Sequence, residues 1–154
     1  MSGEEILVER NKIFFELAEQ KLALLPGVQD YLEMVSHNFT NALVTSSRQD
    51  YLDIVFRKTG IHTCFDLIID GSMVQHGKPD PEGYVMAARM LDVEPRNCLV
   101  FEDAPSGVLS GKAADIQVVN IPSPYVRGDS ALKKADFHFT SMEEVTLEWV
   151  QSLD

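Results

Sequence analysis

The chain has 154 residues, of which 45% are hydrophobic, and this length suits one domain with a hydrophobic core. Its 13 Lys and Arg residues against 24 Asp and Glu residues give a formal net charge of -11 at pH 7. A chain this negative repels nucleic-acid backbones and anionic membrane surfaces, so we expect no nucleic-acid partner and no membrane partner. Two cysteines, Cys64 and Cys98, stand apart in apolar stretches, which is typical of reduced thiols. We therefore expect a cytoplasmic protein.

Hydrophobic periodicity predicts helices that alternate with strands along the chain. The expected elements, in chain order, are a helix over 4–24, a helix over 28–36, a strand over 42–44, a helix over 47–58 capped by Gly60, a strand over 65–69, a helix over 81–92, a strand over 98–101, a helix over 106–114, a strand over 117–121, a short apolar stretch over 136–139 and a helix over 142–153. Strands that alternate with helices form a parallel sheet covered on both faces. We predict an α/β fold in three layers, similar to a Rossmann fold.

The first candidate binding segment follows the strand over 42–44. In an open parallel sheet, ligands bind beyond the carboxyl ends of the strands. The hydroxyl of Thr45, with the amides of Ser46 and Ser47 at the start of the next helix, would bind a phosphate group. The alternative is that one of these hydroxyls only caps the helix. Arg48 is a candidate substrate contact, or an exposed residue on a solvated helix face.

The second candidate segment is a turn between the strand over 65–69 and the helix over 81–92. Lys78 lies in this turn, between Gly77 and a proline, and could direct its ammonium group at a phosphoryl oxygen. Taken alone, it could equally be an ordinary surface lysine. His76 borders the turn and is a candidate substrate contact.

The third candidate segment ends the strand over 98–101 with two adjacent carboxylates, Glu102 and Asp103. Hard oxygen ligands beside a phosphate suit Mg²⁺. A solvated turn that caps the following helix is the alternative reading of the same pair. The order and spacing of the three segments favour a single site that binds phosphate and metal.

These segments are similar to three motifs of the haloacid dehalogenase-like hydrolases, in the order in which that family carries them. The residues concerned are Leu43-Val44-Thr45-Ser46-Ser47, Gly77-Lys78-Pro79-Asp80-Pro81 and Val100-Phe101-Glu102-Asp103-Ala104-Pro105. The sequence resembles most closely the branch that contains β-phosphoglucomutase and pseudouridine-5'-phosphatase. The resemblance implies that Thr45 and Lys78 act on the phosphoryl group in catalysis, and that Glu102 and Asp103 hold Mg²⁺.

The family's first motif, an Asp-x-Asp-x-Thr strand that carries the nucleophile and the general acid, has no counterpart in this sequence. The resemblance therefore implies two regions: residues 1–24 as a residual cap or replacement helix, and residues 25–154 as a core domain that lacks its first strand. It also implies a Mg²⁺-dependent phosphatase or phosphomutase for a small phosphorylated metabolite, a sugar phosphate or a nucleotide. Without the two aspartates, we expect this chain to be inactive alone.

Several alternatives stay open. The chain could be a non-catalytic module, derived from the same fold, that binds phosphate, metal or another protein. The missing motif could reflect genuine loss, a split gene or an incorrect start. In the family the missing strand lies between the strands at 42–44 and 98–101, so its absence would leave two unpaired inner edges. We expect self-association through these edges, with the helix over 4–24 helping to cover the exposed apolar surface.

Overall fold

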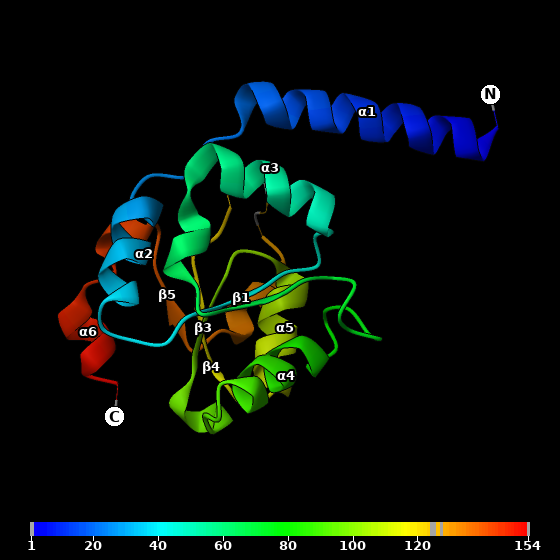
Figure 1. Ribbon diagram of the computed structural model, residues 1–154. Helices are drawn as coiled ribbons and strands as arrows, with labels where there is room; N and C mark the ends of the chain where they lie inside the picture. The colour runs from blue at the N-terminus through cyan, green and yellow to red at the C-terminus, as the bar shows by residue number, and fades with distance from the viewer. Residues whose placement is uncertain (1, 124–125, 127, 154) are drawn as a thin grey trace.

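Figure 1 shows the computed structural model, which describes residues 2–123, 126 and 128–153. Its helices and strands are α1 (Gly3–Lys21), α2 (Val28–Ser36), β1 (Ala42–Val44), α3 (Gln49–Thr59), β2 (Leu67–Ile69), α4 (Glu82–Met90), β3 (Leu99–Glu102), α5 (Pro105–Ala113), β4 (Gln117–Asn120), β5 (Phe137–His138) and α6 (Leu147–Gln151). The predicted α/β alternation is confirmed. Met1 and Asp154, at the ends of the two expected regions, lie outside the described residues.

Local capping residues determine where α3 ends and where α6 begins. Gly60 ends α3 in the left-handed conformation, with φ of 73°, as the sequence predicts. The expected closing helix over 142–153 is wrong in its first half, because the Thr146 hydroxyl accepts a hydrogen bond from the Trp149 amide at 3.2 Å and so starts α6 at Leu147. A 3₁₀ turn, Met142–Glu144, precedes it.

The strands form two parallel sheets instead of one. β1 pairs with β2, and β3 pairs with β4, which pairs with β5. No described strand joins β1 to β3, so both keep an open edge. We call the space between these two edges the seam.

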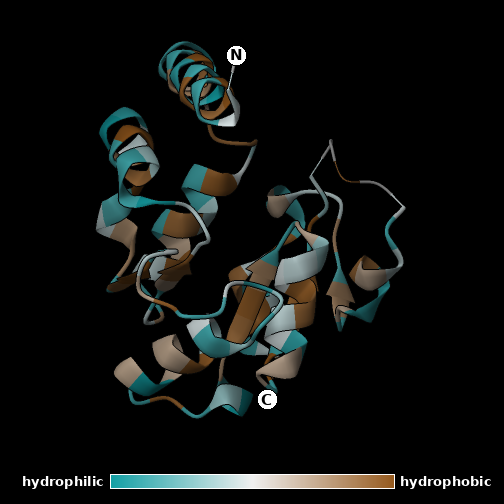
Figure 2. Cartoon of the chain, turned by 90° about the vertical axis from the view of Figure 1, so that its right-hand side faces the viewer, coloured by the Kyte–Doolittle hydropathy of each residue, from teal (hydrophilic) through white to brown (hydrophobic). Residues whose placement is uncertain are grey.

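Helices cover both faces of the three-stranded sheet, which gives the predicted three layers. Val100 packs with Tyr84 of α4 and Val108 of α5 in one buried cluster. Phe101, the next residue, points to the other face and packs with Tyr31 of α2, at 5.0 Å between ring centroids. In Figure 2 the central strands are largely brown, so the hydrophobic residues lie where the layers meet.

The two sheets are held together by helices. α4 contacts β1 and β2 on one side of the seam and α5 on the other. The side chain of Val44, in β1, also packs against the cluster of Tyr84 and Val100. The halves therefore share a hydrophobic core although their strands do not pair.

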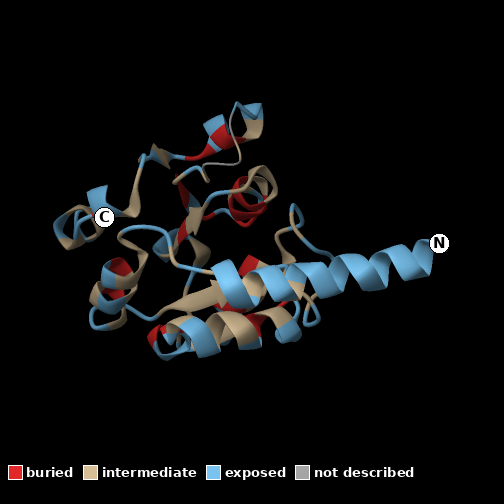
Figure 3. Cartoon of the chain, turned by 90° about the horizontal axis from the view of Figure 1, so that it is seen from above, coloured by how far each residue is buried: buried red, intermediate tan, exposed pale blue. Residues whose placement is uncertain are grey.

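The N-terminal helix α1 projects from this body (Figures 1 and 3) and has no buried residue. It rests on α3 through the rings of Phe14 and Tyr51, 5.1 Å apart, and through an ion pair between Glu19 and Arg57. Its large apolar residues remain about half exposed, namely Ile6, Leu7, Val8, Ile13, Phe14 and Leu17. The expectation that this helix helps to cover apolar surface on self-association stays a prediction; within one molecule, α1 leaves its own apolar side about half exposed. None of the described helices combines the length and hydrophobicity needed to span a bilayer.

Candidate phosphate and metal site

Lys78 is the centre of the candidate site. Its ammonium group donates hydrogen bonds to the backbone carbonyl of Val44 at 3.0 Å, to the Tyr84 hydroxyl at 2.9 Å and to the Glu102 carboxylate. The Lys78 side chain is 16% exposed and that of Glu102 is 8% exposed, so this ion pair is largely shielded from water. An ammonium group has three donors, and here all three bond to protein oxygens.

These contacts join the carboxyl end of β1, at Val44, to the carboxyl end of β3, at Glu102. The expected convergence of the second and third segments is therefore present, made by the Lys78 side chain although β1 and β3 belong to separate sheets. Lys78 bridges the seam at this end.

Tyr84 completes the arrangement, and sequence reasoning did not find it. Its hydroxyl donates a hydrogen bond to the same Glu102 oxygen that Lys78 contacts, and the Lys78 ammonium lies 4.7 Å from the centroid of its ring. Burial, reinforced by the negative charge of Glu102, raises the pKa of Tyr84, so the hydroxyl stays protonated and acts as a donor. The available signal was its place on the apolar side of α4, six residues after Lys78.

The Glu102 carboxylate lies against the first turn of α5, in space that is open because Gly107 has no side chain. A Cβ atom at Gly107 would lie 1.9 Å from the Glu102 carboxyl carbon. Only glycine permits so close an approach at this position. The sequence around Glu102 therefore fixes where its carboxylate sits.

Asp103 follows Glu102 and is exposed, so it could reach a ligand beyond the strand end. Partial desolvation, together with the neighbouring Glu102 charge, raises the pKa of Asp103. Two carboxylates that repel each other form an oxygen donor set that a hard divalent cation would stabilise. The residues present thus fit Mg²⁺.

The segment after β1 differs in part from its prediction. α3 begins at Gln49, two residues later than expected, so the amides of Ser46 and Ser47 do not open the helix. The Ser47 amide instead donates to the Thr45 hydroxyl at 3.0 Å, forming a local turn. Thr45 and Ser46 still line a small crevice beside Lys78. Arg48 does not line it: its side chain is 83% exposed, 3.7 Å from Asp50.

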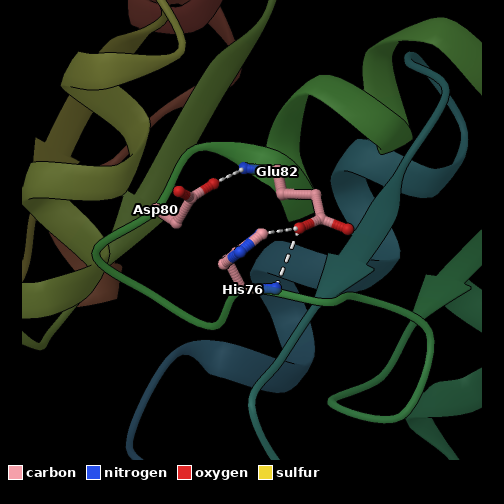
Figure 4. Close-up of side chains that lie close together, drawn as sticks. All are labelled: His76, Asp80 and Glu82. Carbon is pink, nitrogen blue, oxygen red and sulfur yellow. Dashed lines mark hydrogen bonds and ion pairs between the residues drawn. The ribbon is translucent and has the colours of Figure 1, made fainter.

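His76 lines the same crevice, close to two carboxylates (Figure 4). Glu82 accepts hydrogen bonds from the backbone amides of Gln75, at 2.8 Å, and His76, at 2.9 Å, and its carboxylate lies 3.1 Å from His76 Nδ1. Asp80 accepts from the Glu82 amide at 3.0 Å, in the turn that leads into α4. Potential ligand atoms of His76, Asp80 and Glu82 lie within 4.8 Å of one another. Because hydrogen bonds within this turn account for the closeness of the three side chains, this group needs no ion to explain it.

Comparison with known proteins decides the family. The model of a family described as haloacid dehalogenase-like hydrolase matches residues 4–121. The chain belongs to the haloacid dehalogenase-like hydrolases. The family resemblance read from the three segments is confirmed.

Curated relatives share its sequence over their matched parts. Identity is 39% over 103 residues to validoxylamine A 7'-phosphate phosphatase of Streptomyces hygroscopicus subsp. limoneus, covering 67% of this chain and 47% of the relative. It is 37% over 110 residues to a phosphorylated carbohydrates phosphatase of Thermotoga maritima, covering 71% of this chain and 49% of the relative. The chain thus spans about half the length of these relatives.

Solved structures share the fold. β-Phosphoglucomutase from Clostridium difficile superposes with a TM-score of 0.80 at 29% identity, over 99% of this chain and 68% of that one. CbbY from Rhodobacter sphaeroides, solved with phosphate, superposes with a TM-score of 0.84 at 26% identity, over 96% and 68%. The predicted phosphoglucomutase-like and phosphatase-like branch is confirmed.

Proposed function

We propose that this chain carries the phosphate- and Mg²⁺-binding part of a phosphatase or phosphomutase that acts on a small phosphorylated metabolite. The single observation that supports it most is the buried contact of Lys78 with Glu102 at the joined ends of β1 and β3. It brings a cation and a carboxylate together at the carboxyl ends of β1 and β3, and Thr45 lines a crevice beside the same lysine. Phosphatases among the relatives act on phosphorylated carbohydrates by name, which supports a sugar phosphate as substrate.

In the proposed site, Glu102 and Asp103 would hold Mg²⁺, and Thr45, Ser46 and Ser47 would contact the phosphoryl group. Bound there, the metal would neutralise charge on phosphoryl oxygens. Lys78 would add a positive charge, which requires that phosphate displace one of its three present acceptors. His76 and Arg48 are exposed and would contact only the outer part of a substrate.

We propose that the chain alone does not hydrolyse the ester. A covalent route needs an attacking carboxylate at a strand end facing the phosphate. Asp70, directly after β2, is 7% exposed, and its oxygen Oδ1 accepts hydrogen bonds from the amide and hydroxyl of Ser72 at 2.7 and 2.6 Å. These bonds give Asp70 a role in its turn and leave it poorly suited to attack.

The alternative is a non-catalytic binding module. It would use the same site, but it would hydrolyse no phosphate ester even when a partner is added. The open edges of β1 and β3 support association in either case, with a second copy or with another chain. The free thiols of Cys64 and Cys98 support a reducing, cytoplasmic setting.

The test measures binding and turnover separately. With Mg²⁺ present, a panel of sugar phosphates and nucleotides is titrated into the chain, and release of inorganic phosphate is followed in parallel. We expect saturable binding that Lys78→Ala removes, and negligible turnover. Absence of any binding would contradict the proposed site. Turnover of ~1 to 10³ s⁻¹, lost in Lys78→Ala, would contradict the proposed inactivity.

A further inference from the structure

The turn that leads into α4 brings one imidazole and two carboxylates together (Figure 4). Potential ligand atoms of His76, Asp80 and Glu82 all lie within 4.8 Å of one another. Among the residues that the structure describes, no other three histidine, cysteine or acidic side chains gather in this way. We call these three residues the turn cluster. It shares no residue with the Glu102 and Asp103 pair.

Two members of the turn cluster already have the spacing of neighbouring ligands on one ion. His76 Nδ1 and Glu82 Oε2 are 3.1 Å apart. Zinc bonds to nitrogen and carboxylate oxygen of about 2.0–2.2 Å, at angles from 90° to tetrahedral, separate neighbouring ligand atoms by about 2.8–3.6 Å. A modest movement of Asp80 would add the third ligand.

Hydrogen bonds hold both carboxylates in position and leave them able to bind an ion. Glu82 accepts from the amides of Gln75 and His76, at 2.8 and 2.9 Å, and Asp80 Oδ1 accepts from the Glu82 amide at 3.0 Å. An ionised carboxylate has about four lone-pair sites, so both side chains keep further acceptor capacity. Carboxylates that bind metals are themselves commonly hydrogen-bonded. The same bonds that explain the turn therefore orient its ligands.

The backbone of the turn is anchored from outside the cluster. The Ser110 hydroxyl, on α5, donates a hydrogen bond to the Asp80 carbonyl at 2.7 Å, and Ser110 is 1% exposed. The Asp80 amide donates to the Gly77 carbonyl at 3.1 Å. Because the turn is already ordered, little backbone entropy would be lost when an ion binds.

The chemistry of the donors selects the class of metal. Imidazole nitrogen suits Zn²⁺ and other transition metals, whereas Mg²⁺ prefers oxygen ligands throughout. Two carboxylates neutralise the charge of a divalent cation. The His76 side chain is 69% exposed and that of Glu82 is 26% exposed, so an ion could enter from solvent. Three protein ligands leave the fourth position of a tetrahedral zinc ion for water or another ligand.

We propose that His76, Asp80 and Glu82 form a second metal site, which binds Zn²⁺ reversibly and in preference to Mg²⁺. His76 and Asp80 also line the crevice beside Lys78. The ion would therefore lie at the edge of this crevice, where its fourth position would accept an oxygen of an anion that enters. The site is independent of the proposed function, because it requires neither phosphate nor the Glu102 and Asp103 pair.

The experiment adds Zn²⁺ alone to the whole chain after treatment with a chelator. Nuclear magnetic resonance of the histidine rings follows the site, because the chain has four histidines and three of them serve as internal references. The ring nitrogen signals of His76 should shift with saturation, while those of the references His37, His62 and His138 stay in place. A large excess of Mg²⁺ should not reverse the shift.

Calorimetric titration of variants tests each ligand. His76→Ala removes the exposed imidazole, and Asp80→Asn keeps an oxygen that can accept from the Glu82 amide. Each change should weaken Zn²⁺ binding at least about tenfold, since even the loss of a group that only supports a ligand has that effect. His138→Ala, which removes another exposed histidine, should bind like the wild type. Glu82 is left intact because its hydrogen bonds shape the turn.

The Zn²⁺ site should persist in Asp103→Asn, which separates it from the proposed Mg²⁺ site. Thermal melts verify that each variant is folded; should Asp80→Asn unfold, the His76 signals and His76→Ala decide. Absence of Zn²⁺ binding at up to millimolar concentration would overturn the proposal and leave the cluster as a hydrogen-bonded turn. Unchanged affinity in either folded variant, equal shifts of all four histidines, or loss of the site in Asp103→Asn would also overturn it.

Discussion

Lys78 and Glu102, 24 residues apart in the chain, form an ion pair that ties together two strands with no backbone pairing between them. Both side chains are mostly shielded from water. Removing one partner of such a pair leaves a buried charge uncompensated, whereas removing both leaves none.

Lys78→Met should therefore lower the free energy of unfolding by about 3–5 kcal/mol. The double change Lys78→Met with Glu102→Gln should lower the free energy of unfolding by less than the sum of the two single changes, because it leaves no unpaired buried charge. Urea unfolding of the wild type, the two single variants and the double variant measures this coupling. Strict additivity would show that the two side chains do not interact in solution.

Gly107→Ala should displace the Glu102 carboxylate, because the new Cβ would overlap it. We expect a loss of about 1–3 kcal/mol in the free energy of unfolding, typical of overpacking. Gly77→Ala is the matched control, because a Cβ at Gly77 meets no atom within 4 Å. Equal stability of the two variants in thermal melts would contradict the placement of Glu102.

Glu82 should contribute a pH-dependent part of the stability. Hydrogen bonds from the amides of Gln75 and His76 lower the pKa of Glu82 below its ordinary value of 4.5. The folded chain therefore releases this proton more readily, so the stabilisation is complete above pH 4.5 and is lost as the pH falls through the lowered pKa.

Glu82→Gln should consequently melt below the wild type at about pH 7, and the difference should shrink as the pH falls below 4.5. Glu9→Gln, on the exposed side of α1, should match the wild type throughout this range. A Glu82→Gln deficit that stays constant as the pH falls would contradict the electrostatic origin.

Deletion of residues 2–12 should change the free energy of unfolding by no more than about 0.5 kcal/mol. This part of α1 has no buried residue and lies before the contact between Phe14 and Tyr51. As a positive control, Leu52→Ala in α3, where the side chain is 4% exposed, should cost about 2–5 kcal/mol. A deletion as costly as Leu52→Ala would mean that α1 packs on the body along its length.

The sequence predicted the layout well because local patterns determine it. Alternating apolar segments specify helices and strands, and the carboxyl ends of parallel strands must meet, so Lys78 and Glu102 could be placed together before any coordinates. Gly60 likewise takes the left-handed conformation, with φ of 73°, at the end of α3, where the local sequence decides the helix end.

Other features depend on contacts that no local pattern encodes. Tyr84 looks like any buried helical tyrosine, and its bond to Glu102 exists only because α4 packs beneath the seam. The late start of α3 reflects the Thr45 turn, which competes with helical hydrogen bonding. The apolar spacing of α1 predicted a helix, but could not reveal that its apolar side would stay exposed.

The central claim is that Glu102 and Asp103 form a metal site, and thermal melts with increasing Mg²⁺ test it most directly. Starting from chelator-treated protein, the wild-type Tm should rise by about 5–11 °C when Mg²⁺ reaches about 100 times its Kd, because the ion binds only the folded state. Asp103→Asn should abolish the rise, whereas Asp115→Asn, at an exposed position away from the site, should keep it. A wild-type Tm that ignores millimolar Mg²⁺, or an Asp103→Asn variant that responds like the wild type, would contradict the account.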